Sequence, residues 1–356
     1  MRARCVALLV AVLAAPAAAT EPGAGPAVVC APAPLIDADF PDPDLFVDPA
    51  PGGGVFAYAT NAAAPNGGGM LNVPFSRSAD PALAHWSAPA EALPRLPSWA
   101  QPGYTWAPAV AHRPGGPYRL YFTARYGFSG RPCVGVAVAD SPAGPFTPTD
   151  DVRPLVCPLG LGGAIDPDVF REDDGGEYLL WKTDSNCCDG GPEIYIQKLA
   201  ADGLSLVGPH AADGPWLLAD AVSLLRRDQP WEGRVVEAPS LRKHDGRYVL
   251  FYSGGFYASV GYAVGYAVSD SLLGPYRKAA APILATTDAG LTGPGGEMVF
   301  TGPDGGDWMA FHGWRADSGR TYRAFYLGRI DWASGLPVVR TDCAPPPEIT
   351  IEPGRR

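Results

Sequence analysis

A repeated segment is the feature that most restricts the fold of this chain. Residues 134–146 and 264–276 share one pattern: an alternating apolar run, an Asp-Ser turn and a Gly-Pro-aromatic step. A strand-like run precedes each, at 118–123 and 247–253, and similar runs occupy 55–60, 177–182 and 307–312. These runs start about 60 residues apart, so the chain contains five units. Units that recur at a nearly constant period indicate a repeat architecture.

The units are predicted to consist of β-strands. The runs are short, rich in β-branched and aromatic residues, and bounded by Gly, Asp and Pro, and further strands are expected at 71–78, 194–199 and 323–330. Sustained helical periodicity is not found, and 44 glycines and 40 prolines favour turns. We therefore predict an all-β fold, a five-bladed β-propeller over residues 35–345, followed by a tail at 346–356. A pair of β-sandwiches is the alternative, but it does not explain why alternate units resemble each other.

The first residues have the pattern of an export signal. A basic start is followed by an apolar run at 6–13 and by small residues up to position 19, and the run is too short to span a bilayer. We expect a signal peptide at 1–19, a flexible lead-in at 20–34 and a secreted protein. The cysteines beyond the leader are even in number, which favours disulfides in an oxidising compartment with 15 possible pairings. They are Cys30, Cys133, Cys157, Cys187, Cys188 and Cys343, and a Cys30–Cys343 bond would tie the ends of a ring.

Charge excludes two classes of partner. Only 18% of the residues are charged, and the formal net charge is −10. A chain of this kind lacks the basic surface that binds nucleic acid or an anionic membrane. We expect no nucleic-acid partner, no membrane partner and a neutral substrate.

Three acidic residues occur in similar contexts at the entrance to strand pairs. Asp42, Asp166 and Glu237 each stand before the first strand of a unit, next to Pro or Ala-Pro. The first strand of every propeller blade lines the central channel, so these carboxylates are expected to converge near the axis. Converging carboxylates alter one another's protonation, which indicates catalysis or a cation site, with accidental turn residues as the alternative. The role of turn former is assigned here to Asp44, Asp168, Asp173, Asp174 and Asp245.

The three motifs, in this order and spacing, resemble those of glycoside hydrolase family 43. They are Pro41-Asp42-Pro43-Asp44, Ile165-Asp166-Pro167-Asp168 and Val236-Glu237-Ala238-Pro239, and the resemblance covers about residues 35–342. It implies a five-bladed propeller and an inverting glycosidase. Asp42 would be the general base, Glu237 the general acid, and Asp166 the carboxylate that holds and tunes the acid. Inversion requires the two acting carboxyl groups to lie roughly 6.5–9.5 Å apart, which leaves room for a water molecule.

The same resemblance implies further substrate contacts. Trp106, in Tyr104-Thr105-Trp106-Ala107-Pro108, would stack on a sugar face, and Arg323 would reach a sugar hydroxyl near the acid. Asn186 is a candidate hydroxyl contact. The alternatives are a core tryptophan for Trp106 and a surface strand residue for Arg323. Three other tryptophans, Trp99, Trp216 and Trp231, are expected to pack loops or to contribute to sugar subsites.

A metal is considered only for the central channel. His312 lies in a segment that resembles a family motif in which histidine faces a cation, often calcium, through water. A hydrogen-bonded histidine without metal is the alternative. Glu297 adds an acidic group near the axis and would serve a cation or the pocket. The chemistry itself is expected to need no cofactor.

Three functions are compatible with these motifs. The first is hydrolysis of α-L-arabinofuranosyl or β-D-xylosyl linkages in plant cell-wall polysaccharide, with arabinan, arabinoxylan or their oligosaccharides as partners. The second is a retaining enzyme of the invertase type, which is disfavoured because Asp44 replaces a typical Asn and no Glu-Cys motif accompanies Glu237. The third is a non-catalytic sugar-binding propeller, which predicts that one of the three acids would be missing.

Overall fold

A computed structural model describes the chain from residue 33 to residue 341. Gaps in this description fall at 51, 81, 187–190, 209–214, 217, 219, 288–289, 318–319 and 334. The predicted signal peptide, most of the predicted lead-in and the predicted tail lie outside the described residues. So do Cys30, Cys187, Cys188 and Cys343, and with them the predicted bond between the chain ends.

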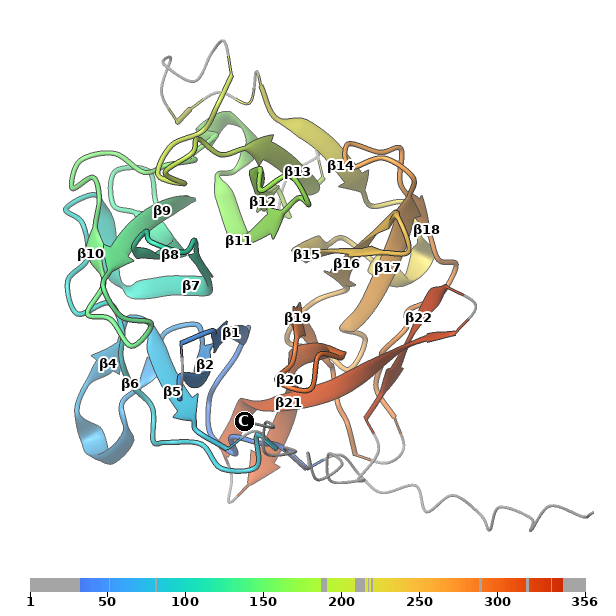
Figure 1. Cartoon of the computed structure of the whole chain (residues 1–356), viewed down its shortest axis with the longest axis horizontal. Coiled ribbons are helices and arrows are strands. Elements are labelled where there is room, and N and C mark those ends of the chain that lie inside the picture. The colour runs from blue at the N-terminus through green and yellow to red at the C-terminus, as the bar shows by residue number, and fades with distance from the viewer. Residues whose placement is uncertain are drawn as a thin grey trace, which may run out of the picture.

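Five four-stranded antiparallel sheets are arranged around a central axis, which confirms the predicted all-β five-bladed propeller (Figure 1). The first strand of each blade lies near the axis in Figure 1. In chain order the blades are β1 (Asp44–Asp48), β2 (Gly54–Tyr58), β5 (Pro74–Ser78) and β6 (Ala90–Glu91); β7 (Ala100–His112), β8 (Tyr118–Tyr126), β9 (Pro132–Ala139) and β10 (Thr147–Pro148); β11 (Ala164–Arg171), β12 (Glu177–Thr183), β13 (Glu193–Lys198) and β14 (Val222–Arg226); β15 (Val236–His244), β16 (Arg247–Gly254), β17 (Ala263–Ser269) and β18 (Arg277–Lys278); and β19 (Gly295–Thr301), β20 (Asp307–Asp317), β21 (Arg320–Ala333) and β22 (Leu336–Arg340).

Minor elements decorate the blades. A short hairpin of β3 (Ala62–Ala63) and β4 (Met70–Leu71) projects from the first blade. Single turns of 3₁₀-helix, η1 (Pro65–Gly67), η2 (Leu159–Leu161) and η4 (Pro230–Glu232), lie in connections. Within the described ranges, no helix has the length and apolar character needed to cross a membrane.

The hydrophobic core is divided among the blade interfaces. Each of five buried apolar clusters joins one blade to the next, including the fifth blade to the first. Alternation along β12 illustrates the cause: Leu179 and Trp181 pack toward the second blade, whereas Leu180 packs toward the fourth. Because both faces of a blade are covered, its central strands consist of continuous apolar runs, and the sequence predicts them well.

The ring closes through the segment before β1. Ile36 forms an antiparallel bridge with Phe325 of β21, and the Phe40 amide donates to the Arg323 carbonyl over 2.8 Å. The Phe40 and Phe325 rings lie 5.9 Å apart. The Tyr322 hydroxyl also donates to Asp37 over 2.7 Å. These contacts hold the first strand of the first blade beside the last blade.

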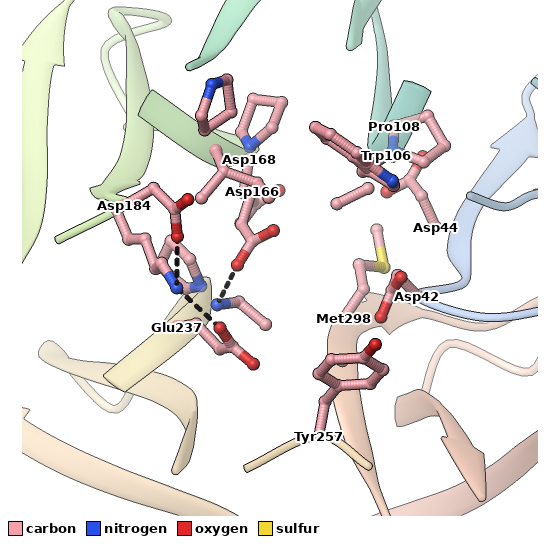
Figure 2. Close-up of a pocket in the computed structure, with 18 of the residues that line it drawn as sticks. Asp42, Asp44, Trp106, Pro108, Asp166, Asp168, Asp184, Glu237, Tyr257 and Met298 are labelled. Atoms are coloured by element: carbon pink, nitrogen blue, oxygen red, sulfur yellow. Dashed lines mark hydrogen bonds and ion pairs between the residues drawn. The ribbon is translucent and has the colours of Figure 1, made fainter. Parts of the chain in front are cut away.

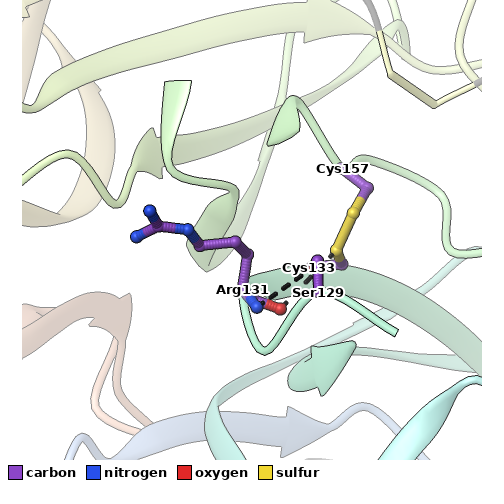
Figure 3. Close-up of a disulfide and its surroundings, with 4 residues drawn as sticks. All are labelled: Ser129, Arg131, Cys133 and Cys157. Atoms are coloured by element: carbon purple, nitrogen blue, oxygen red, sulfur yellow. Dashed lines mark hydrogen bonds between the residues drawn. A yellow bond between two sulfur atoms is a disulfide. The ribbon is translucent and has the colours of Figure 1, made fainter. Parts of the chain in front are cut away.

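One disulfide is present among the described residues. Cys133 at the start of β9 is bonded to Cys157 in the connection that follows β10 (Figure 3). Both cysteines are fully buried in the cluster between the first two blades. The bond anchors the connection to the third blade close to Pro132, which lines the central cavity.

Candidate active site

A cavity of about 470 Å³ occupies the end of the central axis. The first strands of all five blades, or the residues just before them, contribute to its walls. Six of the seven predicted site residues line it: Asp42, Trp106, Asp166, Asn186, Glu237 and Arg323. The seventh, His312, is fully buried beside Asp42. Figure 2 shows Glu237 and Asp166 on one side of the cavity, with Asp42 and Trp106 on the other.

A left-handed residue marks the same point in every blade. Asp42, Ala107, Asp166, Ala238 and Gly296 all have φ between 42° and 59°, a region that residues other than glycine rarely enter. In the second to fifth blades the strand register shifts at this residue, as in a β-bulge. A bulge redirects side chains, and here it turns them toward the axis.

The bulge corrects the assumption that the three predicted acids are equivalent. Asp42 and Asp166 are themselves the left-handed residues of their blades, but Glu237 precedes the left-handed Ala238. Its counterparts are Trp106 and Ile165, as the pairing of all three with the neighbouring strands confirms. Alignment of the motifs on their prolines would have shown the offset, because Asp42 and Asp166 directly precede Pro whereas Glu237 stands one residue earlier.

Each left-handed residue donates its amide to a side chain of the preceding blade. In this way the backbone that presents the site is fixed by the neighbouring blade. The bonds are Ala107 N to Thr60 Oγ1 (2.9 Å), Asp166 N to Thr123 Oγ1 (3.2 Å), Gly296 N to Ser253 Oγ (2.9 Å), Asp42 N to His312 Nδ1 (3.2 Å) and Ala238 N to Asp166 Oδ2 (2.9 Å). Gly296 must be glycine, since a Cβ there would lie 2.5 Å from an Asp42 oxygen.

Asp42 is surrounded by hydrogen-bond donors and a cation. Thr60 Oγ1 donates to Oδ2 over 2.6 Å, and an Arg323 guanidinium nitrogen lies 3.3 Å from both carboxylate oxygens. Burial raises the pKa of Asp42, but the Arg323 guanidinium, the adjacent His312 ring and the hydrogen bond from Thr60 outweigh it and hold that pKa well below its usual range. Asp42 is therefore a charged carboxylate that can accept a proton.

His312 is fully buried and contacts Asp42. Its Nδ1 lies 3.2 Å from Asp42 Oδ1 and accepts the Asp42 amide, while burial lowers the pKa of the ring and keeps it neutral. The other ring nitrogen, Nε2, is buried and has no partner within the described part of the chain. That part also contains no group of three or more His, Cys, Asp or Glu side chains that could hold a metal directly. The orphaned Nε2 fits a water molecule, or a cation reached through water.

Glu237 and Asp166 form the opposite side of the cavity. Tyr262 donates its hydroxyl to Glu237 Oε1 over 2.8 Å, and Lys182 Nζ lies 2.7 Å from Glu237 Oε2. Burial raises the pKa of Asp166, and the neighbouring Glu237 carboxylate raises it further. Asp166 therefore retains a proton more readily than Asp42 does.

Lys182 and Tyr262 were not predicted as site residues. Lys182 is 1% exposed and ends the apolar run Tyr178–Trp181, and a lysine inside such a run is unusual enough to have been a signal. Tyr262 follows a loop of ordinary composition and carries no such signal. Its ring packs over Gly295, where a Cβ would collide with it.

The predicted substrate contacts occupy separate walls. Trp106 is half-buried and meets Tyr104 edge to face at 6.0 Å. The Asn186 amide donates to Asp184 over 3.1 Å and its oxygen accepts from Lys182 over 3.0 Å. The Arg323 guanidinium lies over the Tyr257 ring at 5.2 Å. Each of the three predicted contacts can therefore meet a ligand in the cavity.

The other tryptophans lie outside this lining. Trp99 stacks on Phe122 at 6.1 Å, and Trp231 stacks on Tyr252 at 5.7 Å, both within blade interfaces. Trp216 is partly exposed and contacts Tyr126. Among the described residues, these three side chains serve packing, one of the two roles considered for them.

Asp44 and Asp168 are not turn formers, contrary to the prediction. Each lies in the first strand of its blade, two residues after the left-handed position. Asp44 Oδ2 accepts the Val110 amide of the next blade over 2.8 Å, and Asp168 accepts the Leu241 amide of its next blade. Burial raises the pKa of both carboxyls, to about 6 for Asp168. They connect blades, a role that depends on contacts distant in sequence.

Glu297 lines the cavity from the fifth blade and is 4% exposed. The Ser253 hydroxyl donates to its Oε2, while its Oε1 has no hydrogen-bond partner in the described structure. Burial raises the pKa of this carboxyl well above its usual value. Burial therefore favours the neutral form of Glu297 over a fourth negative charge in the cavity.

Comparison with known proteins finds that this chain and its fold are similar to those of glycoside hydrolases. A solved thermostable family-43 glycoside hydrolase superposes with a TM-score of 0.70 and 27% identity, over 85% of this chain and 92% of that chain. A β-D-galactofuranosidase of Aspergillus niger is 30% identical over 246 residues, which are 65% of this chain and 63% of the relative. A xylosidase/arabinosidase of Humicola insolens is 33% identical over 173 residues, 42% of this chain and 50% of the relative.

The family model for glycosyl hydrolases family 43 matches residues 32–337. The chain therefore belongs to this family, as its three motifs predicted. It spans between half and just under two thirds of the length of these two curated relatives.

Proposed function

We propose that this protein is an inverting glycosidase that hydrolyses α-L-arabinofuranosyl or β-D-xylosyl linkages of plant cell-wall polysaccharide. Asp42 acts as the general base and Glu237 as the general acid. Asp166 orients the acid and adjusts its proton affinity. The predicted leader supports action outside the cell, on arabinan, arabinoxylan or their oligosaccharides.

The contrast between the two sides of the cavity carries this proposal. Arg323 and Thr60 hold Asp42 in its charged form, as a base requires. Across the cavity, Asp166 and Glu237 share a buried site with a raised proton affinity at Asp166. Two carboxyl sites with opposite proton affinities are the arrangement that acid–base glycoside cleavage needs.

The reaction then follows in one balanced step. Asp42 removes a proton from a water molecule as the water oxygen bonds to the anomeric carbon. The bond between that carbon and the glycosidic oxygen breaks, and Glu237 gives its proton to the departing oxygen. The sugar leaves with inverted configuration, and proton exchange with solvent restores both carboxyl groups.

The sugar class is supported by the relatives and by the lining. One relative bears the name xylosidase/arabinosidase, and another is a galactofuranosidase, which acts on a five-membered sugar ring. Trp106 and Tyr104 offer aromatic faces to an apolar sugar surface, and Asn186 and Arg323 offer polar atoms to hydroxyls. The cavity volume of about 470 Å³ suits one sugar residue with part of its neighbour.

Product analysis tests the proposal directly. The protein without its leader is assayed on aryl α-L-arabinofuranoside, β-D-xyloside and β-D-galactofuranoside, and on arabinan and arabinoxylan. NMR of the first-formed sugar is expected to show inversion. Asp304→Asn is a suitable control. Asp304 lies in the turn between β19 and β20, pairs with Arg329 of β21 and does not line the cavity. Absence of turnover on every substrate, or a retained configuration, would contradict the proposal.

A further inference from the structure

One blade departs from the ring of amide bonds described above. In four blades the side chain paired with the position before the bulge is Thr60, Thr123, Ser253 or His312, and each accepts an amide of the next blade. In the third blade the corresponding residue is Lys182, which pairs with Ile165. A lysine ammonium has no acceptor, so it cannot take the Ala238 amide, and Asp166 accepts that amide instead.

Lys182 directs its charge to the acid side of the cavity. Its side chain is 1% exposed, and its Nζ lies 2.7 Å from Glu237 Oε2, 3.0 Å from Asn186 Oδ1 and 3.5 Å from an Asp184 oxygen. Burial of an ammonium group is unfavourable unless it is paired and hydrogen-bonded. The ammonium group donates hydrogen bonds to Glu237 and Asn186 and forms an ion pair with Asp184. These contacts fix the position of Lys182, and with it that of Glu237.

The two donors on Glu237 differ in one respect. Tyr262 can donate or accept through its hydroxyl, whereas Lys182 can only donate. A proton on Glu237 is therefore favoured at Oε1, while Oε2 remains the acceptor of Lys182. An acid that protonates a leaving oxygen must present its proton in a fixed direction.

We infer that Lys182 is a positioning residue for the general acid, which holds Glu237 by Oε2 and leaves Oε1 to carry the transferred proton. The exchange of a hydroxyl for a lysine in one blade is the structural change that produces this arrangement. Because Lys182 cannot accept the Ala238 amide, Asp166 accepts it and thereby also fixes the backbone next to Glu237. This inference rests on the proposed function, because that function gives Glu237 the role of acid.

Leaving-group dependence tests this role. An aryl glycoside with a strongly acidic phenol departs without proton assistance, whereas an alkyl glycoside or oligosaccharide needs the acid. Lys182→Met is expected to lower kcat about 100-fold on the poor leaving group, and no more than about threefold on the activated one. Lys182→Thr introduces a hydroxyl like those of Thr60, Thr123 and Ser253. It is expected to behave like Lys182→Met and can be tested in its place if Lys182→Met does not fold.

The matched control is Lys278→Met. Lys278 is also almost fully buried and lies 2.7 Å from the buried Glu232, but it belongs to β18 at the outer edge of the fourth blade. Its loss is expected to lower the melting temperature and to leave the ratio of the two rates unchanged. An equal loss on both substrates in a folded Lys182 variant would overturn the inference.

A crystal structure of the Lys182→Met variant gives a second outcome that does not depend on activity. The Glu237 carboxylate is expected to rotate away from its position in the native protein. If Glu237 keeps that position, the inference is wrong even when the protein is an active glycosidase. Absence of wild-type turnover, by contrast, would count against the proposed function.

Discussion

The two sides of the central cavity contain the same chemical group in opposite surroundings. Asp42 and Asp166 occupy the same left-handed position in their blades, and both are partly buried. Beside Asp42 stand Arg323 and hydroxyl and imidazole partners, and its pKa is lowered. Beside Asp166 stands a second carboxylate, and its pKa is raised. The repeat therefore sets where an acid lies, and the neighbouring blade sets whether it is charged.

This contrast also explains how a symmetric fold yields an asymmetric site. The amide of each left-handed residue is fixed by the preceding blade, so the character of that blade's acceptor matters. His312 precedes Asp42, accepts its amide, and lies 3.2 Å from its carboxylate. Lys182 precedes Glu237 and contributes a charge. Substitution of one residue per blade is enough to separate the base side from the acid side.

The largest effect is expected from removing the two acting carboxylates. Asp42→Asn abolishes the base and should lower kcat by about 10³- to 10⁴-fold on every substrate. Glu237→Gln should cause a similar loss on glycosides with poor leaving groups and a much smaller one on activated aryl glycosides. Steady-state kinetics on both substrate types measures this, and equal behaviour of the two variants would remove the distinction between the two sides.

A second effect follows from removing the cation beside Asp42. Arg323 lowers the pKa of that carboxyl, so Arg323→Gln should raise the pKa of Asp42. The base must be ionised, and the acidic limb of the pH–rate profile should therefore move to higher pH. The profile of kcat/KM from pH 3 to pH 8 tests this. An unmoved acidic limb would mean that another group governs it.

Stability should change in opposite directions on the two sides. The folded pKa of Asp42 is lowered, so its contribution to stability is present above the unfolded pKa and lost on acidification. The folded pKa of Asp166 is raised, so it destabilises the fold once pH rises above the unfolded value. At pH 8, Asp166→Asn should raise the melting temperature by about 1–3 °C and Asp42→Asn should lower it by a similar amount.

The control for this pair is the same measurement at low pH. Near pH 3.5 Asp166 is protonated and resembles asparagine, so its difference should vanish, whereas the pKa of Asp42 is held so low that this carboxylate stays charged and most of its difference should persist. Asparagine tolerates the left-handed conformation, which keeps the backbone cost small. Two variants that shift in the same direction at pH 8 would show that backbone or packing effects outweigh charge.

The smallest effect concerns the channel cation. We propose that a calcium ion, reached from His312 through water, can occupy the space beside the unpartnered Nε2. Chelation should then lower the melting temperature of the wild type and leave His312→Ala unaffected. An unchanged wild-type melting temperature after chelation would contradict this proposal. It would favour the alternative, a hydrogen-bonded histidine without metal.

Much of the fold and the principal acids could be predicted from the sequence. The central strands are continuous apolar runs, because both faces of each blade are buried, and the 264–276 segment repeats the 134–146 segment. The Asp-Pro and Glu-Ala-Pro motifs mark the starts of the first strands. These are local signals, and they indicated the correct part of each blade.

The remaining features depend on contacts that local patterns do not contain. The Ala238 amide beside Glu237 is held by Asp166, 72 residues away. The interblade role of Asp44 requires the Val110 amide, 66 residues away. Lys182 gave a signal, a charge within an apolar strand, but its meaning required Glu237 beside it. Sequence reasoning thus found the acids together with Arg323 and His312. It placed Arg323 near the acid instead of beside Asp42, and it missed the two partners of Glu237, Lys182 and Tyr262.

Closure of the ring has a consequence for how the protein is made. Asp42 emerges early during synthesis, but His312 and Arg323 are 270 and 281 residues further along the chain. The acid side is complete when the fourth blade has folded, whereas the base side waits for the last blade to dock on the first. Since chains are synthesised from the N-terminus, the proposed mechanism predicts that a nascent or truncated chain lacks a complete base and is inactive. Activity is therefore expected only after the whole chain has been translated and folded.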